Sequence, residues 1–338
     1  MPARRVLAVL LAALSGTAVA ACGSDEDGGG DRAPRGPASA TLRAELAKAT
    51  NVDVSRFPQA DGRTLRELAD GLDGTGTTVG LATTIFPTPK PRLAFGVIDG
   101  ENAFVYAPTV VYLARSENAK AIGPFPAPAD LLVTDPPFRS RQAASEKDPF
   151  AAVYTAQVQA AQPGAYRVLV VSEVNGDLVG APSQIEVIDP AKDPVVAPGE
   201  KAPAVETDTV ASAGGDVASI DTRIPPSDLH DESLKDVLGR KPVALLFATP
   251  QLCQSRVCGP VVDIELQLKA KYGDRMAFIH QEVYVDNDLA KGLRPPLEAF
   301  GLPTEPWLFT IRRDGTVAAR LEGSFGFRSF ETAIRAAL

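Results

Sequence analysis

Two cysteines, Cys253 and Cys258, are the side chains in this sequence best suited to covalent chemistry. A cysteine pair can form a disulfide, exchange that disulfide with other thiols, or bind a soft metal ion. If residues 253–258 were all helical, the two side chains would lie about 140° apart around the axis and about 7.5 Å apart along it. That separation is too large for a disulfide. The pair can therefore close only if residues 254–257 form a turn ahead of the helix.

The elements around the pair follow from the apolar pattern. Residues 242–248 form a short apolar run, which is typical of a buried parallel strand. After the cysteines, Val261, Ile264 and Leu268 recur at helical spacing, and Pro260 suits the first helical position. The pair is thus expected between a central strand and a helix N-terminus. Backbone N–H groups and the helix dipole stabilise a thiolate at such a place.

This strand, cysteine pair, helix and a later proline resemble the thioredoxin fold, and residues 198–203 resemble the lead-in of its peroxiredoxin-like and TlpA-like branches. The resemblance implies that Cys253 is the nucleophile, that Cys258 resolves the mixed disulfide, and that the two form a redox-active disulfide. It also implies a cis-proline facing them, which we place at Pro306, with Pro303 as the alternative. A competing alignment matches residues 258–261 to the family's Cys-Gly-Pro-Cys motif with its second cysteine lost. A purely structural disulfide also fits.

The rest of residues 223–338 fits the same fold. A short helix is expected at residues 233–238, and the order from residue 241 onward is β-α-β-α-β-β-α. The expected later elements are a strand at 276–283, a helix within 288–300 interrupted by two prolines, a third strand into which residues 301–311 lead, a strand at 316–321 and a helix at 327–338. This order matches a thioredoxin-like α/β domain.

Several residues depart from the family pattern. Leu246 stands where many thioredoxins bury an acid, and Leu252 replaces the tryptophan before the first cysteine. Glu305 would place a charge beside the thiolate. His230 and His280 are the only histidines, and we expect His280 to be packed or hydrogen-bonded rather than a ligand. We expect no metal site and no organic cofactor, because the cysteine pair would itself be the redox centre.

The first 21 residues are typical of a targeting segment, with Arg4 and Arg5 ahead of an apolar run. Residues 19–22, Val-Ala-Ala-Cys, resemble the lipobox of bacterial lipoproteins. That resemblance implies a signal peptide at 1–21 and a diacylated Cys22 that anchors the chain to the extracytoplasmic face of the cell membrane. Disulfides persist in that compartment. An ordinary secretory signal with an incidental cysteine is the alternative. Residues 22–40 are expected to be a disordered tether.

The charge balance limits the possible partners. The full sequence has a net charge of −8, and removal of residues 1–21 takes away two arginines and no acid, which leaves −10. An acidic protein of this kind does not suit nucleic acid and offers no basic patch to anionic lipids. The expected partners are therefore thiols or disulfides of exported proteins, or a redox partner protein, with membrane contact through the lipid anchor.

Between tether and cysteine domain, residues 41–74 are expected to form a short helical segment and residues 75–189 a β-sandwich. Tyr166 and the residues before it resemble the tyrosine corner of immunoglobulin-like domains, with Val168 where antibody domains place a cysteine. The Pro-rich residues 122–129 are expected to be an exposed loop, and residues 190–222 a linker. The expected strands are residues 78–85, 93–98, 103–107 with 110–114, 131–134, 151–160, 166–174 and 183–188.

The sequence thus predicts an all-β immunoglobulin-like sandwich followed by an α/β thioredoxin-like domain. The expected function is that of a membrane-anchored thiol–disulfide oxidoreductase that acts on exported proteins through its Cys-x4-Cys pair. The alternative is a redox-inactive binding lipoprotein whose pair is a structural disulfide. A copper-binding assembly factor is a further alternative, because copper-delivery proteins share the fold and bind copper with two cysteines and a histidine.

Overall fold

The structure is a computed structural model that describes residues 40–144 and 151–338. The predicted signal peptide, the Cys22 lipidation site and all but the last residue of the tether lie outside the described residues. Within the described part of the chain, none of the helices has the length and apolar character needed to cross a membrane.

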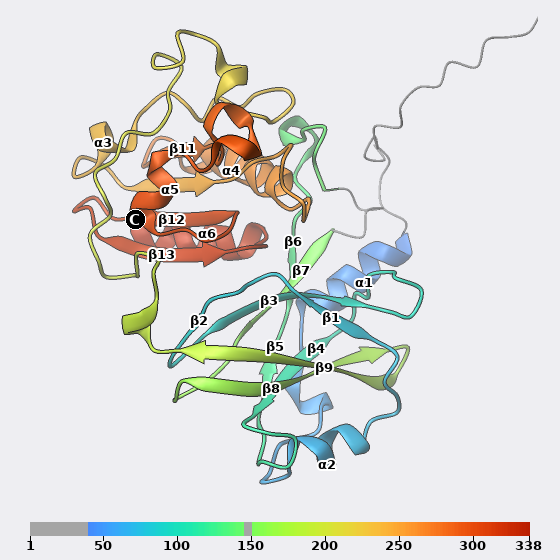
Figure 1. The fold of residues 1–338 in the computed structure, drawn as a ribbon. Coiled ribbons are helices and arrows are strands. Elements are labelled where there is room, and N and C mark those ends of the chain that lie inside the picture. The colour runs from blue at the N-terminus through green and yellow to red at the C-terminus, as the bar shows by residue number, and fades with distance from the viewer. Residues whose placement is uncertain (1–39, 145–150) are drawn as a thin grey trace, which may run out of the picture. The chain divides into compact units, whose positions relative to one another are not determined.

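The N-terminal half contains two β-sheets that share one apolar core (Figure 1). The core takes Phe95 and Tyr154 from one sheet and Val111, Val168 and Ile185 from the other. One sheet has the strand order β1-β3-β7-β6 and the other β2-β9-β8-β4-β5. The strands are β1 (Thr78–Leu81), β2 (Phe86–Pro87), β3 (Arg92–Ile98), β4 (Thr109–Ala114), β5 (Ile122–Pro126), β6 (Ala129–Leu131), β7 (Ala152–Gln157), β8 (Gly164–Val174) and β9 (Asp177–Ile188).

Neighbouring strands in the two sheets are antiparallel, except that β2 pairs with β9 in parallel. Strands β8 and β9 form the longest hairpin, and its turn contains Asn175 and Gly176, both with positive φ. This turn chemistry matches the twist of a hairpin. The Tyr166 hydroxyl donates to the carbonyl of Gln162 at 3.0 Å, which is the contact expected of a tyrosine corner.

Three predictions about strands were wrong, and one of them is the strand at 131–134, where only Leu131 lies in a strand, as the last residue of β6. Residues 122–126 form β5 at the edge of a sheet instead of a loop, and their register pairs Val110 with Pro126. Proline lacks a donor for the ladder but is tolerated on an edge strand, which has one unpaired side. Residues 103–107 make only an isolated bridge, between Phe104 and Ile98.

Helical elements precede the sandwich, as predicted for residues 41–74. They are α1 (Ala40–Thr50), a 3-10 turn (Val54–Arg56) and α2 (Leu65–Asp70). Helix α2 begins with a capping box, in which the Thr64 side chain and the Glu67 side chain each bond the other's backbone N–H. Leu65 and Leu68 pack against the sheet residues Val110 and Tyr112.

The C-terminal half contains a four-stranded mixed sheet with the order β11-β10-β12-β13. Its elements are α3 (Leu234–Val237), β10 (Val243–Phe247), α4 (Cys258–Tyr272), β11 (Ala277–Gln281), α5 (Pro295–Phe300), β12 (Trp307–Ile311), β13 (Val317–Glu322) and α6 (Phe327–Ala337). Strand β10 pairs in parallel with β11 and antiparallel with β12. The predicted β-α-β-α-β-β-α order from β10 onward is present.

Alternate residues of β10 enter two different cores. Ala244 and Leu246 pack with residues of α4 and α6, whereas Val243, Leu245 and Phe247 pack with residues of α3 and α5. Because both faces are covered, all five residues of β10 are buried. The apolar run in the sequence is the direct consequence.

Two further predictions need correction. Helix α5 begins at Pro295 and contains Pro296, so these prolines start the helix rather than interrupt it. Residues 190–222 are not merely a linker, because Val195 and Ala202 are buried in the core of the C-terminal sheet. Lys201 also makes a bridge with Thr316 beside β13.

Candidate functional site

The two cysteines lie at the junction of β10 and α4. Cys258 is the first residue of α4, and Cys253 lies in the preceding loop, where its N–H donates to the Thr249 carbonyl at 3.1 Å. The chain turns between them, with Arg256 at a φ of 59°. The predicted turn ahead of the helix is therefore confirmed. Pro260 is the third helical residue rather than the first, a position that still lacks an intrahelical N–H partner.

Both cysteines are free thiols in this structure, so the predicted disulfide is not formed here. The hydrogen bond from the Cys258 thiol lowers the pKa of Cys253, and with bonds from Ser255 and the Cys258 N–H it outweighs burial, so the pKa is about 6. The Ser255 hydroxyl lies 3.2 Å from the Cys253 sulfur. Burial raises the pKa of Cys258 well above its usual value. The pair thus has one acidic thiol and one that stays protonated.

The predicted cis-proline lies at the start of β12. The Glu305–Pro306 bond is cis, and Pro303 is not in a cis bond. The charge of Glu305 opposes the ionisation of both cysteines. Burial raises the pKa of Glu305 itself. Glu305 therefore moderates the acidity of Cys253.

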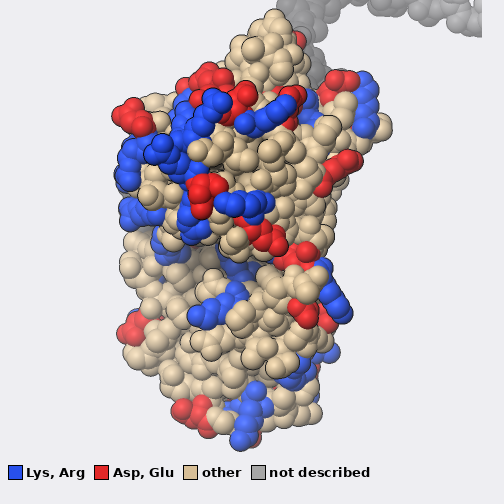
Figure 2. Space-filling model, turned by 90° about the vertical axis from the view of Figure 1, so that its left-hand side faces the viewer, with Lys and Arg blue, Asp and Glu red and all other residues tan. Residues whose placement is uncertain are grey.

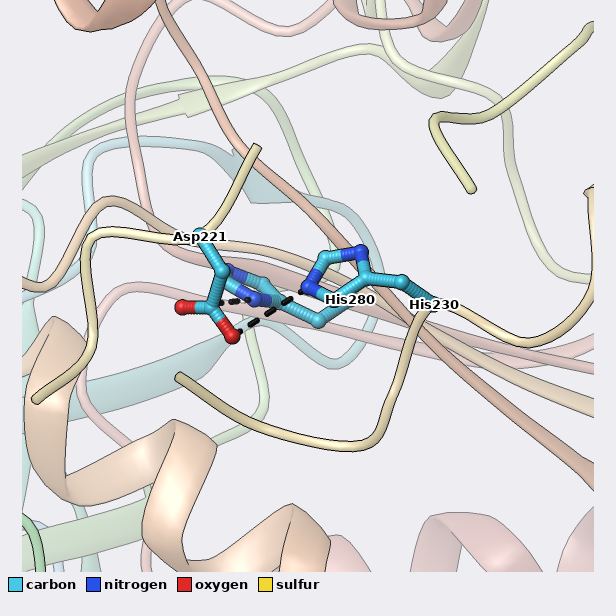
Figure 3. Close-up of side chains that lie close together, drawn as sticks. All are labelled: Asp221, His230 and His280. Atoms are coloured by element: carbon cyan, nitrogen blue, oxygen red, sulfur yellow. Dashed lines mark hydrogen bonds and ion pairs between the residues drawn. The ribbon is translucent and has the colours of Figure 1, made fainter. Parts of the chain in front are cut away.

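A second group of polar side chains lies in the same half of the chain (Figure 3). Asp221, His230 and His280 are each 0–2% exposed, and one donor atom from each lies within 4.8 Å of the others. His230 Nε2 is 3.2 Å from Asp221 Oδ2, and His280 Nδ1 is 3.6 Å from Asp221 Oδ1. His280 Nε2 also lies 3.0 Å from the Ala248 carbonyl, so its predicted hydrogen-bonded state is confirmed.

Charge and burial act against each other in this cluster. Burial lowers the pKa of His280, but the Asp221 carboxylate, Glu282 and the Ala248 carbonyl outweigh it and raise the pKa to about 9. Burial would raise the pKa of Asp221, yet the charge of His280 and hydrogen bonds from both histidines and Ser227 hold that pKa far below its usual range. The cluster is therefore built around a buried carboxylate.

Sequence reasoning missed this cluster. The histidines were identified, but Asp221 lies in the segment expected to be a linker. No spacing rule connects its three members, since Asp221 and His230 lie on irregular backbone and His280 lies on β11. The one signal in the sequence was the small number of histidines, two in 338 residues. The structure buries both of them beside the same acid.

Surface charge is mixed rather than uniformly acidic on the face drawn in Figure 2, where Lys and Arg side chains lie among Asp and Glu side chains. Several basic side chains are ion-paired, such as Lys235 with Glu206 and Lys241 with Glu232. The net charge of the sequence therefore does not describe every face.

Comparisons with known proteins give little. No protein-family model matches the chain, and no curated protein matches it. Among solved structures, the chain is similar to the PKD domain of the human VPS10 domain-containing receptor SorCS2, with 16% identity and a TM-score of 0.18. That similarity covers 35% of this chain and 76% of the PKD domain chain. The proposals below rest on this chain's own residues.

Proposed function

We propose that the C-terminal half is a thioredoxin-like domain and that the chain is a membrane-anchored thiol–disulfide oxidoreductase acting on exported proteins. The observation that carries this is the asymmetry of the two cysteines. Cys253 has a pKa of about 6 and lies in the loop before α4, while Cys258 is fully buried and stays protonated. Thiol–disulfide exchange requires a nucleophilic thiolate and a second thiol beside it that can resolve the mixed disulfide.

The exchange has two steps. The Cys253 thiolate attacks one sulfur of a partner disulfide, which forms a mixed disulfide and releases the other partner sulfur as a thiolate. Cys258 then loses its proton and attacks the Cys253 sulfur, which forms the Cys253–Cys258 disulfide and releases the second partner thiol. The partner gains two electrons and the pair loses two; the reverse sequence oxidises a partner dithiol.

The other parts of the chain would position the cysteine pair relative to the membrane and to its partners. Cys22 would carry the lipid anchor, residues 22–40 would give reach from the membrane, and the sandwich would be an immunoglobulin-like spacer or protein-binding module. Pro306, next to Glu305 near the pair, would shape the groove for an extended partner segment. The mixed strand order β11-β10-β12-β13, with helices on both faces, supports the thioredoxin-like assignment.

The test is the reduction potential of the full chain, measured by equilibration in glutathione buffers and counting of alkylated thiols. We expect a reversible two-thiol transition between about −120 and −270 mV, the range of known exchangers. Cys258→Ala should trap mixed disulfides with exported proteins, and the matched Cys253→Ala variant should trap none. A bond that stays closed below about −300 mV would instead identify a structural disulfide and favour a redox-inactive binding lipoprotein.

A further inference from the structure

The cluster of Asp221, His230 and His280 has the composition of a metal site. Two imidazoles and one carboxylate suit zinc and related divalent transition-metal ions. Their donor atoms converge within 4.8 Å, and Figure 3 shows both imidazoles lying against the carboxylate. The cluster contains neither cysteine.

The hydrogen bonds around His280 fix the nitrogen that faces the cluster. The Ala248 carbonyl can only accept, so the Nε2 at 3.0 Å from it carries a proton and donates. The other nitrogen, Nδ1, faces the Asp221 carboxylate, with Oδ1 at 3.6 Å, and its lone pair becomes available to an ion when Nδ1 is deprotonated. A backbone carbonyl that orients the far nitrogen of a histidine is a usual outer-shell feature of metal sites.

Asp221 is held in place by its own loop. Its Oδ2 accepts the N–H and the hydroxyl of Ser227, both at 2.6 Å, and its Oδ1 accepts the N–H of Arg223 at 2.8 Å. The histidines are brought together by backbone pairing, because the His280 N–H donates to the Leu229 carbonyl beside His230. The three donors are thus positioned before any ion binds.

Two further acidic side chains are buried near the cluster. Glu265 on α4 is completely buried, neither of its carboxyl oxygens has a partner, and its strongest charge interactions are with His280 and then Lys269. Glu282 is also buried, and its carboxylate accepts from the N–H and hydroxyl of Thr222. Burial raises the pKa of Glu265 well above its usual value, so its two unpartnered oxygens are polar groups buried near the cluster.

We propose that Asp221, His230 and His280 bind a divalent transition-metal ion of the zinc class inside the C-terminal half of the chain. His280 binds through Nδ1, Asp221 through its carboxylate and His230 through its ring nitrogen that faces Asp221. Binding through Nδ1 requires that this nitrogen be deprotonated. Its role is to hold residues 221–230 against β11, independently of whether the cysteines exchange disulfides.

Because the chain has only two histidines, NMR can read the site directly. The full chain, ¹⁵N-labelled at histidine and carrying Cys253→Ala and Cys258→Ala so that these thiols cannot bind the probe, is titrated with Zn²⁺. At one equivalent we expect a shift of one ring nitrogen in each histidine, with the His280 Nε2 still protonated. Imidazole signals that stay unchanged at saturating Zn²⁺, or a shift in one histidine alone, would overturn the proposal.

Substitutions give a second test in the same background, which lacks Cys253 and Cys258. Asp221→Asn should weaken Zn²⁺ binding more than about 100-fold in a competition with a chelating dye, since even outer-shell partners contribute about 10–100-fold. Asp130→Asn, which alters an equally buried carboxylate in β6, should leave the affinity unchanged. Equal binding by Asp221→Asn contradicts the assignment. If Asp221→Asn does not fold, the NMR titration of the chain that carries only Cys253→Ala and Cys258→Ala still tests the proposal.

Discussion

At the scale of single residues, the chemistry of the cysteine pair depends on what surrounds each sulfur. Cys253 receives hydrogen bonds from the Cys258 thiol, the Ser255 hydroxyl and the Cys258 N–H, all of which stabilise a thiolate. Cys258 is completely buried, and ionised Cys253 beside it would repel a second charge. Glu305 opposes both ionisations. The two thiols therefore differ because of position rather than residue type.

This account predicts opposite effects of two substitutions on Cys253. In the unchanged chain, iodoacetamide should alkylate Cys253 at a rate that falls as the pH drops below about 6, because only the thiolate reacts. Cys258→Ala removes the main stabilising hydrogen bond and should raise that apparent pKa toward the ordinary value of about 8.5. Glu305→Gln removes an opposing charge and should lower it. Peptide mapping by mass spectrometry gives the rate at each cysteine.

The control is Glu298→Gln, which changes an exposed acid on α5 and should leave the pH profile as it was. A profile that moves in the same direction in Cys258→Ala and Glu305→Gln would contradict the assigned causes.

At the scale of elements, helix α6 depends on a residue from a different part of the chain. Its N-cap is Gly326, which offers no side-chain cap. Instead, the buried Asp130 carboxylate on β6 accepts the N–H groups of Gly326, Arg328 and Ser329 at 2.9–3.1 Å. A Cβ on Gly326 would come within 2.5 Å of the Leu131 carbonyl oxygen, so glycine permits this close approach.

Removal of this cap should be costly. Asp130→Ala leaves three N–H groups at a helix start without their charged acceptor, and we expect the free energy of unfolding to fall by about 3 kcal/mol. Chemical denaturation followed by circular dichroism measures it. Asp274→Ala, at an exposed position after α4, should change the value by less than about 0.5 kcal/mol. A similarly small change for Asp130→Ala would show that water replaces the cap.

At the scale of the whole described chain, the end of β13 connects the C-terminal sheet to the sandwich. The Glu322 carboxylate accepts the Thr84 N–H at 2.8 Å and the following backbone N–H at 3.0 Å. The Arg92 guanidinium donates to the Glu322 carbonyl at 2.9 Å. Gly323, at a φ of +66°, lies so close to the Ala82 carbonyl that a Cβ would be only 1.6 Å away.

These contacts predict that the two halves unfold together. The full chain should show one calorimetric transition, and Glu322→Ala should lower the transition temperature and separate it into two, because the bonds from Glu322 join the halves. Glu298→Ala serves as the exposed control. Two transitions in the unchanged chain, or no effect of Glu322→Ala, would mean that these hydrogen bonds do not couple the halves.

Features that depend on residues close together in the sequence were predicted, and features that depend on distant parts of the chain were missed. The apolar residues 242–248 predicted β10 because a strand buried on both faces must be apolar throughout. The turn between Cys253 and Cys258 followed from helical geometry together with the expectation that the two sulfurs can pair. The strand β5 was missed because Pro124 and Pro126 argue against a central strand, and nothing local indicates that the segment lies at a sheet edge.

The resemblance to the thioredoxin fold led us to expect the cis bond at Pro306. The sequence by itself determined the strand and helix order of the C-terminal half and the loop that carries Cys253 and Cys258. These features depend on short-range periodicity, turn geometry and spacing. Only the tertiary structure decided that Asp221 meets His230 and His280, and that Asp130 caps a helix almost two hundred residues later. Such contacts arise when irregular segments pack against distant elements to satisfy buried polar groups, and sequence patterns carry no record of that pairing.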